Sequence, residues 1–257
     1  MSKKIGLALS GGGARGFAHV GVLKVFAEHD IKFDIVAGTS AGSIIGGALA
    51  AGMTVDEIVD MSGKVGWLNM IRPSVSFGGV LSNVPMGKFL SGHLPVSLIE
   101  DMPTPFAAVA FDLATSKQVV IDRGDLVTAI RASCAVPGVF APVRDAAGRM
   151  LVDGGVISPM PVETVRLMGA DVVIAVDLLS CGATFRANSR TGVGIMIQSA
   201  LSLLRTVAGN ENSTADICIE PQIAHLRPDQ LNKRKEFISL GELAARQKIE
   251  AILELIQ

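Results

Sequence analysis

This sequence lacks an excess of either charge, and it lacks the cysteines that would frame a disulfide scaffold. It has 23 Lys and Arg against 24 Asp and Glu, and its one basic cluster, NKRK at 232–235, is too short to follow a nucleic-acid backbone. The three cysteines, Cys134, Cys181 and Cys218, are odd in number and widely spaced, which suits neither paired disulfides nor a metal site. We therefore expect no nucleic-acid partner and no metal, and we interpret the cysteines as reduced core thiols.

An apolar N-terminal run long enough for a signal peptide is also missing. In MSKKIGLALSGGGARG, two lysines precede a run of only five residues before glycines and Arg15 interrupt it. The sequence therefore predicts a cytoplasmic protein.

One uncharged stretch is long enough to cross a bilayer. It holds 21 residues between Asp34 and Asp56, and Gly38, Gly42 and Gly46 repeat at the four-residue spacing of a transmembrane packing face. Many small polar residues and glycines dilute its hydrophobicity, however, and FDIVAG at 33–38 is typical of a β-strand. A membrane span and a strand followed by a helix are the two interpretations of this stretch.

The rest of the chain alternates strand and helix patterns. We expect strands at 4–9, 33–38, 106–113, 117–122, 149–155, 171–178 and 216–221. We expect helices at 18–30, 41–52, 125–135, 161–169 and 194–209, and capping boxes Thr54–Glu57 and Ser239–Glu242 to begin two more. This alternation, with 49% hydrophobic residues, predicts a single α/β domain over 1–257 whose mainly parallel sheet has helices on both faces.

Residues 63–104 break the alternation. They are rich in Gly, Pro and Met, hold the only Trp of the chain and carry few charges. The segment is either a cap over a site, where apolar side chains would suit acyl chains, or an excursion that contributes to the core.

The motif GTSAG at 38–42 places Ser40 between a strand and a helix in the pattern G-x-S-x-G. Such a turn holds a serine in strained backbone angles with its hydroxyl exposed. The helix that begins at Ala41 points unpaired N–H groups at Ser40, which favours an oxyanion there. A nucleophilic serine and a tight helix start are both consistent with this motif.

A second glycine motif, GGGARG at 11–16, follows the first strand. Its bare N–H groups would suit an oxyanion hole. With Gly11, Gly13 and Gly16 it also matches G-x-G-x-x-G, the pattern of a dinucleotide-binding oxidoreductase. That alternative needs an acidic residue at the end of the second strand, where the sequence has Gly38 and Thr39.

A serine nucleophile needs a base, and the chain has only four histidines. A Ser-Asp-His triad in the order of α/β-hydrolases would have to use His225. Asp153 in LVDGGV is the other candidate, since it ends a strand and its carboxylate is expected at the carboxyl edge of the sheet, where ligands bind in such folds. An ordinary strand-ending turn would also explain this aspartate.

Taken together, SGGGARG, GTSAG, ASCAVPGVFAPV at 132–143 and VDGG resemble the patatin-like phospholipase family over about residues 4–180. The resemblance implies a three-layer α/β/α fold and hydrolysis of acyl esters of lipids, with no metal or organic cofactor. It implies a Ser-Asp dyad of Ser40 and Asp153, and an oxyanion loop at Gly11, Gly12 and Gly13 with Arg15 at its basic position. A lipid or ester substrate, with peripheral contact to the membrane where lipids reside, follows from the same resemblance. Arg15 would hold the loop, draw anionic head groups or form an ordinary salt bridge.

Overall fold

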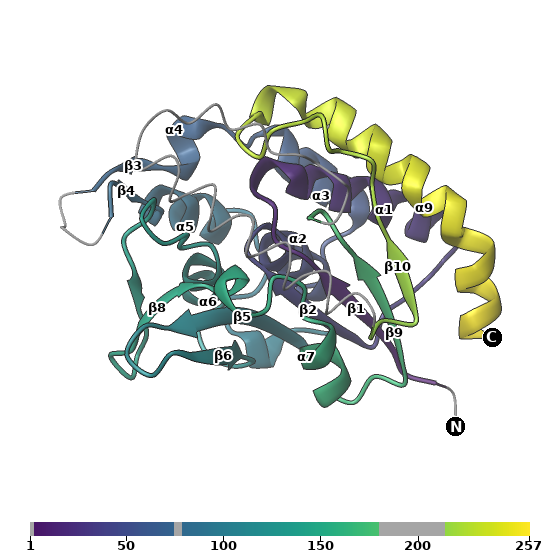
Figure 1. The fold of residues 1–257 in the computed structure, drawn as a ribbon, viewed down its shortest axis with the longest axis horizontal. Helices are drawn as coiled ribbons and strands as arrows, with labels where there is room; N and C mark the ends of the chain where they lie inside the picture. The colour runs from purple at the N-terminus through teal and green to yellow at the C-terminus, as the bar shows by residue number, and fades with distance from the viewer. Residues whose placement is uncertain (1–2, 75–78, 180–213) are drawn as a thin grey trace.

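The computed structural model describes residues 3–74, 79–179 and 214–257 (Figure 1). Its central sheet has the strand order β10-β9-β1-β2-β5-β8-β7, with β6 also paired to β5. The five strands from β10 to β5 are parallel, namely β10 (Ile217–Ile219), β9 (Val172–Val176), β1 (Ile5–Leu9), β2 (Ile35–Thr39) and β5 (Phe106–Asp112). The other three are antiparallel to their neighbours, namely β6 (Lys117–Ile121), β7 (Val143–Arg144) and β8 (Met150–Asp153).

Helices cover both faces of this sheet. On β1, Leu7 and Leu9 belong to the large cluster on one face, whereas Ala8 belongs to the smaller cluster on the other, as the two-residue period of a strand requires. The first face is covered by α1 (Phe17–Glu28), α2 (Ala41–Ala50), α3 (Val55–Gly63), α5 (Val84–Ser91), α6 (Leu126–Ser133) and α9 (Arg234–Ile256). The second carries α7 (Val162–Leu167), on the opposite side of the sheet from α1 and α9 (Figure 1). The expected three-layer α/β/α fold with a mainly parallel sheet is confirmed.

Most expected elements are present within a few residues of their expected bounds. Each of the seven predicted strands is found, and the capping box at the start of α3 is confirmed, with Glu57 N–H donating to Thr54 Oγ1 (3.3 Å) and Thr54 N–H to Glu57 Oε2 (2.8 Å). The second capping box is wrong, because α9 begins at Arg234 and Ser239 lies inside it. The buried Phe237 packs into the core and extends this helix beyond the predicted start. The predicted helix at 194–209 and Cys181 lie outside the described residues.

The segment 63–104 both joins the core and carries exposed apolar side chains. It contains α4 (Trp67–Met70), the antiparallel pair β3 (Arg72–Pro73) and β4 (Leu81–Ser82), and α5. Met86 and Leu90 of α5 are buried in the large cluster, whereas Leu68 of α4 is 97% exposed. The segment therefore contributes to the core, as one of the two expectations had it.

The uncharged stretch between Asp34 and Asp56 divides at Ser40 into β2 and α2. The helical part has ten residues, about half of what a bilayer span needs. Among the residues that the structure describes, no helix is both long and apolar enough to cross a membrane.

Candidate active site

Ser40 occupies the turn between β2 and α2 in a strained conformation. Its backbone angles are φ 52° and ψ −122°, which cost a non-glycine residue about 1–3 kcal/mol. The flanking glycines make the turn sterically feasible. A Cβ on Gly38 would lie 2.3 Å from Gly42 O, and a Cβ on Gly42 would lie 2.1 Å from Leu9 O.

Two hydroxyls hold the backbone of Ser40. Its N–H donates to Ser133 Oγ (2.9 Å), and its C=O accepts from Ser43 Oγ (2.7 Å). Ser133 comes from the end of α6 and is fully buried. Neither serine was predicted from the sequence, although Ser133 lies in the motif ASCAVPGVFAPV.

Asp153 lies at the level of Ser40 on the other side of β5. Thr39 is paired with Val109 and Asp153 with Ala110, so the next residue after Thr39 is level with Asp153. The expectation that Asp153 ends a strand is confirmed, but the reason given for its location was wrong. Because β8 is antiparallel to β5, it descends to Asp153 from beyond the carboxyl edge of the parallel strands.

The surroundings of Asp153 make it a stronger base than a free aspartate. Its residue is 6% exposed, and burial raises the pKa of its carboxyl from 3.8 to about 6. The Ser40 side chain and the Gly155 N–H, which donates to Asp153 Oδ1 (2.7 Å), act in the opposite direction and lower this pKa. The carboxyl is therefore ionised at neutral pH yet binds a proton readily.

Hydrogen bonds hold successive peptide groups of the glycine loop after β1. Gly11 N–H donates to Pro159 O (2.9 Å), Gly11 C=O accepts from Ser10 Oγ (3.2 Å) and Gly12 C=O accepts from Arg15 N–H (3.2 Å). In a trans peptide the N–H points away from the C=O. The Gly12 and Gly13 N–H groups therefore point away from these contacts, and neither has a hydrogen-bond partner among the described residues.

Gly11 and Arg15 do not have the orientation that an oxyanion donor needs. The Gly11 N–H is already bonded to Pro159, which leaves the N–H groups of Gly12 and Gly13 as the ones in this loop without a described partner. Arg15 is 2% exposed, and its guanidinium donates to Leu226 O (2.9 and 3.1 Å) and Leu178 O (3.3 Å). Of the roles weighed for Arg15, contact with anionic head groups is wrong, because the buried side chain ties the loop to two distant segments.

His19 also holds this loop, a role that no sequence motif predicts. Its Nε2 lies 2.9 Å from Ser10 O, and burial lowers its pKa to about 4, so the ring is neutral. Since a carbonyl only accepts, Nε2 carries the ring proton. His19 thereby fixes the Ser10–Gly11 peptide from the side opposite to Pro159.

The two alternative sites are not assembled. In the G-x-G-x-x-G loop the N–H groups of Gly11 and Ala14 are bonded within the protein, the latter to Pro228 O (2.7 Å), so two of the donors that a pyrophosphate cradle would use are already taken. The His225 side chain is exposed, and its Nε2 pairs with Glu236 Oε1 (3.2 Å) at the start of α9. Neither Ser40 nor Asp153 is a partner of His225 among the described contacts.

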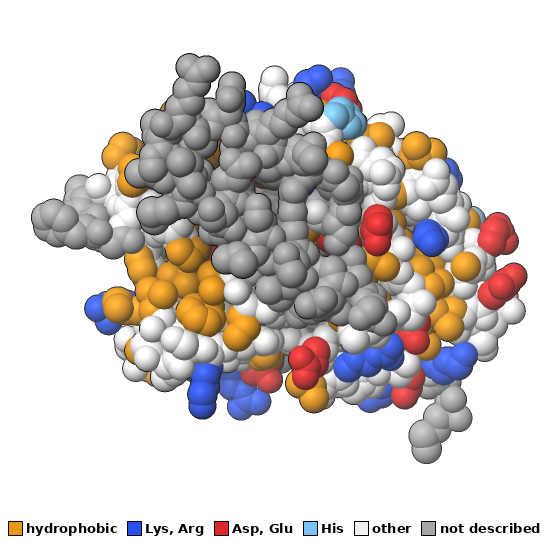
Figure 2. All heavy atoms as spheres, viewed as in Figure 1, with side chains coloured by type: hydrophobic (Ala, Val, Ile, Leu, Met, Phe, Trp, Pro, Cys, Tyr) orange, Lys and Arg blue, Asp and Glu red, His pale blue; other side chains and the backbone are white. Residues whose placement is uncertain are grey.

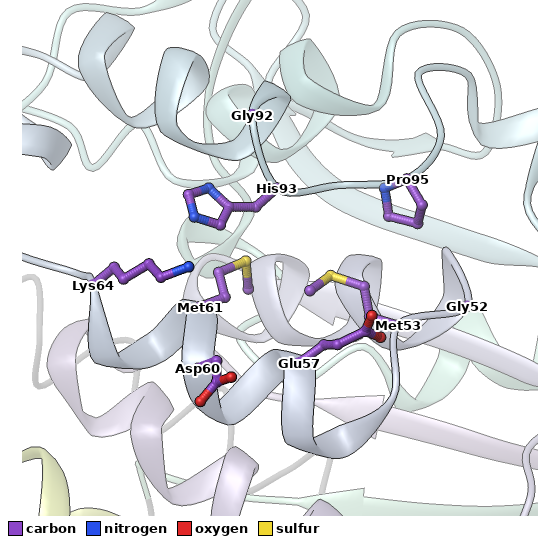
Figure 3. Close-up of a pocket in the computed structure, with 9 residues that line it drawn as sticks. All are labelled: Gly52, Met53, Glu57, Asp60, Met61, Lys64, Gly92, His93 and Pro95. Atoms are coloured by element: carbon purple, nitrogen blue, oxygen red, sulfur yellow. The ribbon is translucent and has the colours of Figure 1, made fainter.

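A separate cavity of about 350 Å³ lies between α3 and the residues that follow α5 (Figure 3). Met53, Met61 and His93 line it together with Glu57, Asp60 and Lys64. None of the residues of the two glycine motifs lines this cavity, so it is distinct from the site around Ser40. Within the described ranges no group of three or more His, Cys, Asp or Glu could hold a metal ion.

The family model described as Patatin-like phospholipase matches residues 7–166, which is more than half of the chain and includes both glycine motifs and Asp153. The chain belongs to the patatin-like phospholipase family. The resemblance seen in the sequence motifs is thereby confirmed.

Relatives of this patatin-like chain include both bacterial and animal proteins. An "Uncharacterized NTE family protein" of Mycobacterium bovis is 39% identical over 180 residues, which cover 69% of this chain and 49% of that protein. "Patatin-like phospholipase domain-containing protein 7" of Rattus norvegicus is 35% identical over 194 residues, covering 72% of this chain and 14% of that protein. The chain thus spans about half or less of the length of these relatives.

Among solved structures, VipD from Legionella pneumophila is similar to this patatin-like chain with a TM-score of 0.57. The match covers 98% of this chain and 67% of VipD at 15% sequence identity. At that identity the similarity concerns the fold alone.

Proposed function

We propose that this chain is a serine acyl hydrolase that cleaves carboxyl esters of lipids through a Ser-Asp dyad. Ser40 is the nucleophile, Asp153 the general base, and the N–H groups of Gly12 and Gly13 the oxyanion donors. The observation that supports the proposal most strongly is the position of a buried carboxylate level with a strained serine, across a single strand.

In the first half of the reaction, Asp153 takes the proton of Ser40 Oγ while this oxygen attacks the ester carbonyl carbon. The carbonyl π electrons move to the oxygen, and the Gly12 and Gly13 N–H groups stabilise the resulting oxyanion. When the tetrahedral intermediate collapses, the alcohol leaves with the proton from Asp153, and the acyl group stays on Ser40. In the second half, water takes the place of Ser40 as nucleophile: Asp153 takes its proton, the water oxygen attacks the acyl carbon, and the acid is released as Ser40 regains its proton from Asp153.

The magnitudes are consistent with an aspartate base. A free Asp, with a pKa about 2.6 units below that of His, would lose about 3.5 kcal/mol of proton affinity relative to His. The elevated pKa of Asp153, about 6, removes most of this deficit. One oxyanion donor contributes roughly 3–4 kcal/mol to the transition state, which is larger than what remains.

Apolar side chains beside the dyad support a lipid substrate. Val156 and Ile157 directly follow the Asp153 turn and are 38% and 36% exposed. Figure 2 shows hydrophobic side chains gathered on the face of the molecule in view, in the region where Figure 1 shows β8. An acyl chain approaching Ser40 would meet such a surface, and the proposal includes a cytoplasmic location with peripheral contact at membranes.

The direct test is hydrolysis of nitrophenyl esters and of a phospholipid, a lysophospholipid and a neutral lipid, combined with labelling by a fluorophosphonate probe. Ser40→Ala is expected to abolish both hydrolysis and labelling while the melting temperature changes little. His225→Ala is the matched control and should retain full activity. Labelling that persists in Ser40→Ala, or loss of activity in His225→Ala, would reject the dyad.

Asp153→Asn separates the chemistry from the fold. Because the folded-state pKa, about 6, lies above the unfolded value of 3.8, ionising Asp153 destabilises the folded protein by about 3 kcal/mol above pH 6, and the effect vanishes below about pH 4. Asp153→Asn should therefore lower kcat by several orders of magnitude yet raise the free energy of unfolding at pH 8, with little change at pH 4. In the wild type, kcat/KM should fall about tenfold per pH unit below pH 6. A flat pH profile between pH 5 and 7 would argue against Asp153 as the base.

A further inference from the structure

The three residues 133–135, at the end of α6, contact both members of the proposed dyad. Ser133 Oγ accepts from Ser40 N–H, and Ala135 C=O accepts from Asp153 N–H (both 2.9 Å). Ser40 and Asp153 are otherwise 113 positions apart in the chain, the first directly after β2 and the second at the end of β8. We propose that this 133–135 segment is a positioning device that sets Ser40 Oγ against the Asp153 carboxylate, with Ser133 as its key positioning residue. The inference rests on the proposed function.

The hydroxyl of Ser133 takes part in two hydrogen bonds, one as donor and one as acceptor. It donates its only proton to Val109 O (2.6 Å), so it can only accept from the Ser40 N–H. Val109 lies on β5, the strand between Ser40 and Asp153. Ser133 thus connects the serine turn to the strand that separates the two groups.

This contact acts where the backbone of Ser40 is strained. A residue at φ 52° keeps that conformation only if its surroundings hold it. The N–H is held by Ser133, and the C=O is held by the Ser43 hydroxyl and N–H. Removing the Ser133 hydroxyl would free one of the two peptides that aim the Ser40 side chain.

Cys134 lies between Ser133 and Ala135 in the chain. It is buried, and its Sγ lies 3.9 Å from Ser43 Oγ. Burial, together with the charge of Asp153, raises the pKa of the thiol, so it stays protonated and unreactive.

A positioning role and a merely structural role predict different kinetics. If Ser133 only stabilises the fold, its removal lowers the melting temperature and leaves the turnover of the folded enzyme unchanged. If it positions Ser40, its removal lowers kcat with little change in KM, since a misplacement of about 1 Å can cost roughly 100-fold. Removal of the Ser133 hydroxyl should also raise the pH at the midpoint of the acid limb of the kcat/KM profile. The reason is that the Ser40 side chain lowers the pKa of Asp153, and this effect is lost when the side chain is misplaced.

Ser62→Ala is a suitable control for this comparison. Ser62 is also a buried serine near a helix end, and its hydroxyl also donates to a main-chain carbonyl, Val59 O (2.6 Å). It makes no described contact with Ser40 or Asp153. Its removal costs the same kind of donated hydrogen bond that Ser133→Ala loses to Val109 O, without touching the proposed device.

The experiment measures nitrophenyl ester kinetics against pH, fluorophosphonate labelling rates and melting temperatures for the wild type, Ser133→Ala, Ser133→Thr and Ser62→Ala. We expect Ser133→Ala to lower kcat and the labelling rate roughly 10- to 100-fold with KM within about twofold, and to raise the acid midpoint. Ser133→Thr keeps the hydroxyl and should recover most of the loss, and Ser62→Ala should match the wild type. If Ser133→Ala melts too low to assay, Ser133→Cys takes its place in the comparison, because cysteine keeps the size of serine but has only a weak donor and acceptor.

Two failures are distinguishable. The positioning role would be overturned, while the proposed function stands, by either of two results. One is a Ser133→Ala protein with the kcat, labelling rate and acid midpoint of the wild type. The other is an equal loss in Ser133→Ala and Ser62→Ala. A wild-type protein that neither hydrolyses esters nor labels at Ser40 would overturn the proposed function, and the positioning role with it.

Discussion

Two glycine-rich turns lie side by side at one edge of the sheet, one after β1 and one after β2, and they use glycine for different purposes. They touch directly, since a Cβ on Gly11 would lie 3.3 Å from Ser40 Cβ and a Cβ on Gly16 would lie 2.7 Å from Ala41 Cβ. In the turn at 38–42, glycine lets a helix approach a strand more closely than any side chain allows. In the loop at 11–16, glycine leaves main-chain donors uncovered, and hydrogen bonds fix where they point.

Glycine is thus required by the fold in the first turn and, under the proposed function, by the chemistry in the second. Substitution should then damage stability in the first turn and turnover in the second.

The largest effect is expected from Gly42→Ala. The new Cβ would lie 2.1 Å from the Leu9 carbonyl oxygen, so β1 and α2 would have to separate, at a cost of about 3 kcal/mol or more. Gly47→Ala in the same helix is the control, because its Cβ would meet side-chain ends alone, Ile130 Cδ1 (3.0 Å) and Phe106 Cζ (3.4 Å), and alanine favours the helix by about 1 kcal/mol. Urea unfolding measures both, and equal stabilities would break the comparison.

A smaller loss of stability but a large loss of turnover is expected from Gly13→Ala. Gly13 has φ +60°, and its Cβ would lie 2.7 Å from Pro228 O, so the loop must shift and its N–H must move. We expect roughly a 100-fold lower kcat, as for the loss of one oxyanion donor, and about 2 kcal/mol lower stability.

Gly169→Ala controls for the left-handed backbone alone. Gly169 has φ +103° with open space around it, and it lies just before β9, at the edge of the sheet opposite to Ser40. It should lose about 1 kcal/mol of stability and no activity. Equal kcat values for the two alanine variants would show that the loop at 11–16 does not supply the donors.

The smallest effect is expected from Ser10→Ala. The Ser10 hydroxyl donates to Gly11 C=O and accepts from Leu178 N–H (2.9 Å), so its loss frees the peptide that aims the Gly12 N–H. We expect about a tenfold lower kcat and a loss of about 1–2 kcal/mol. Ser91→Ala, an exposed serine at the end of α5 that donates to Lys88 O, should change neither quantity. A Ser10→Ala enzyme as fast as Ser91→Ala would remove Ser10 from this account.

Local sequence was sufficient to predict the turn around Ser40. Gly38, Ser40 and Gly42 are contiguous, and the strand before them and the helix after them each have a clear periodicity, so no distant contact is needed. The strands were predicted for the same reason. The start of α9 was not, because the buried Phe237, rather than a capping residue, extends this helix.

The geometry around the two turns depends on partners far away in the chain. Gly11 loses its donor to Pro159, and Arg15 points to Leu178 and Leu226, none of which a local motif identifies. The direction of β8 is likewise not encoded in its own four residues, which is why the position of Asp153 was predicted for the wrong reason. Ser133 lay within a quoted motif, but nothing in that motif indicates that its hydroxyl reaches Ser40.

The antiparallel direction of β8 has a consequence for how this protein can vary. A shift of one residue between β8 and β5 would turn the Asp153 carboxylate to the other face of the sheet, because neighbouring strand residues face opposite sides. A one-residue deletion inside β8 should therefore abolish the hydrolytic activity even if the sheet re-forms. The exposed hairpin turn at 146–149, which joins β7 to β8, can instead take up inserted residues without altering that pairing, so a peptide tag grafted there should leave catalysis intact.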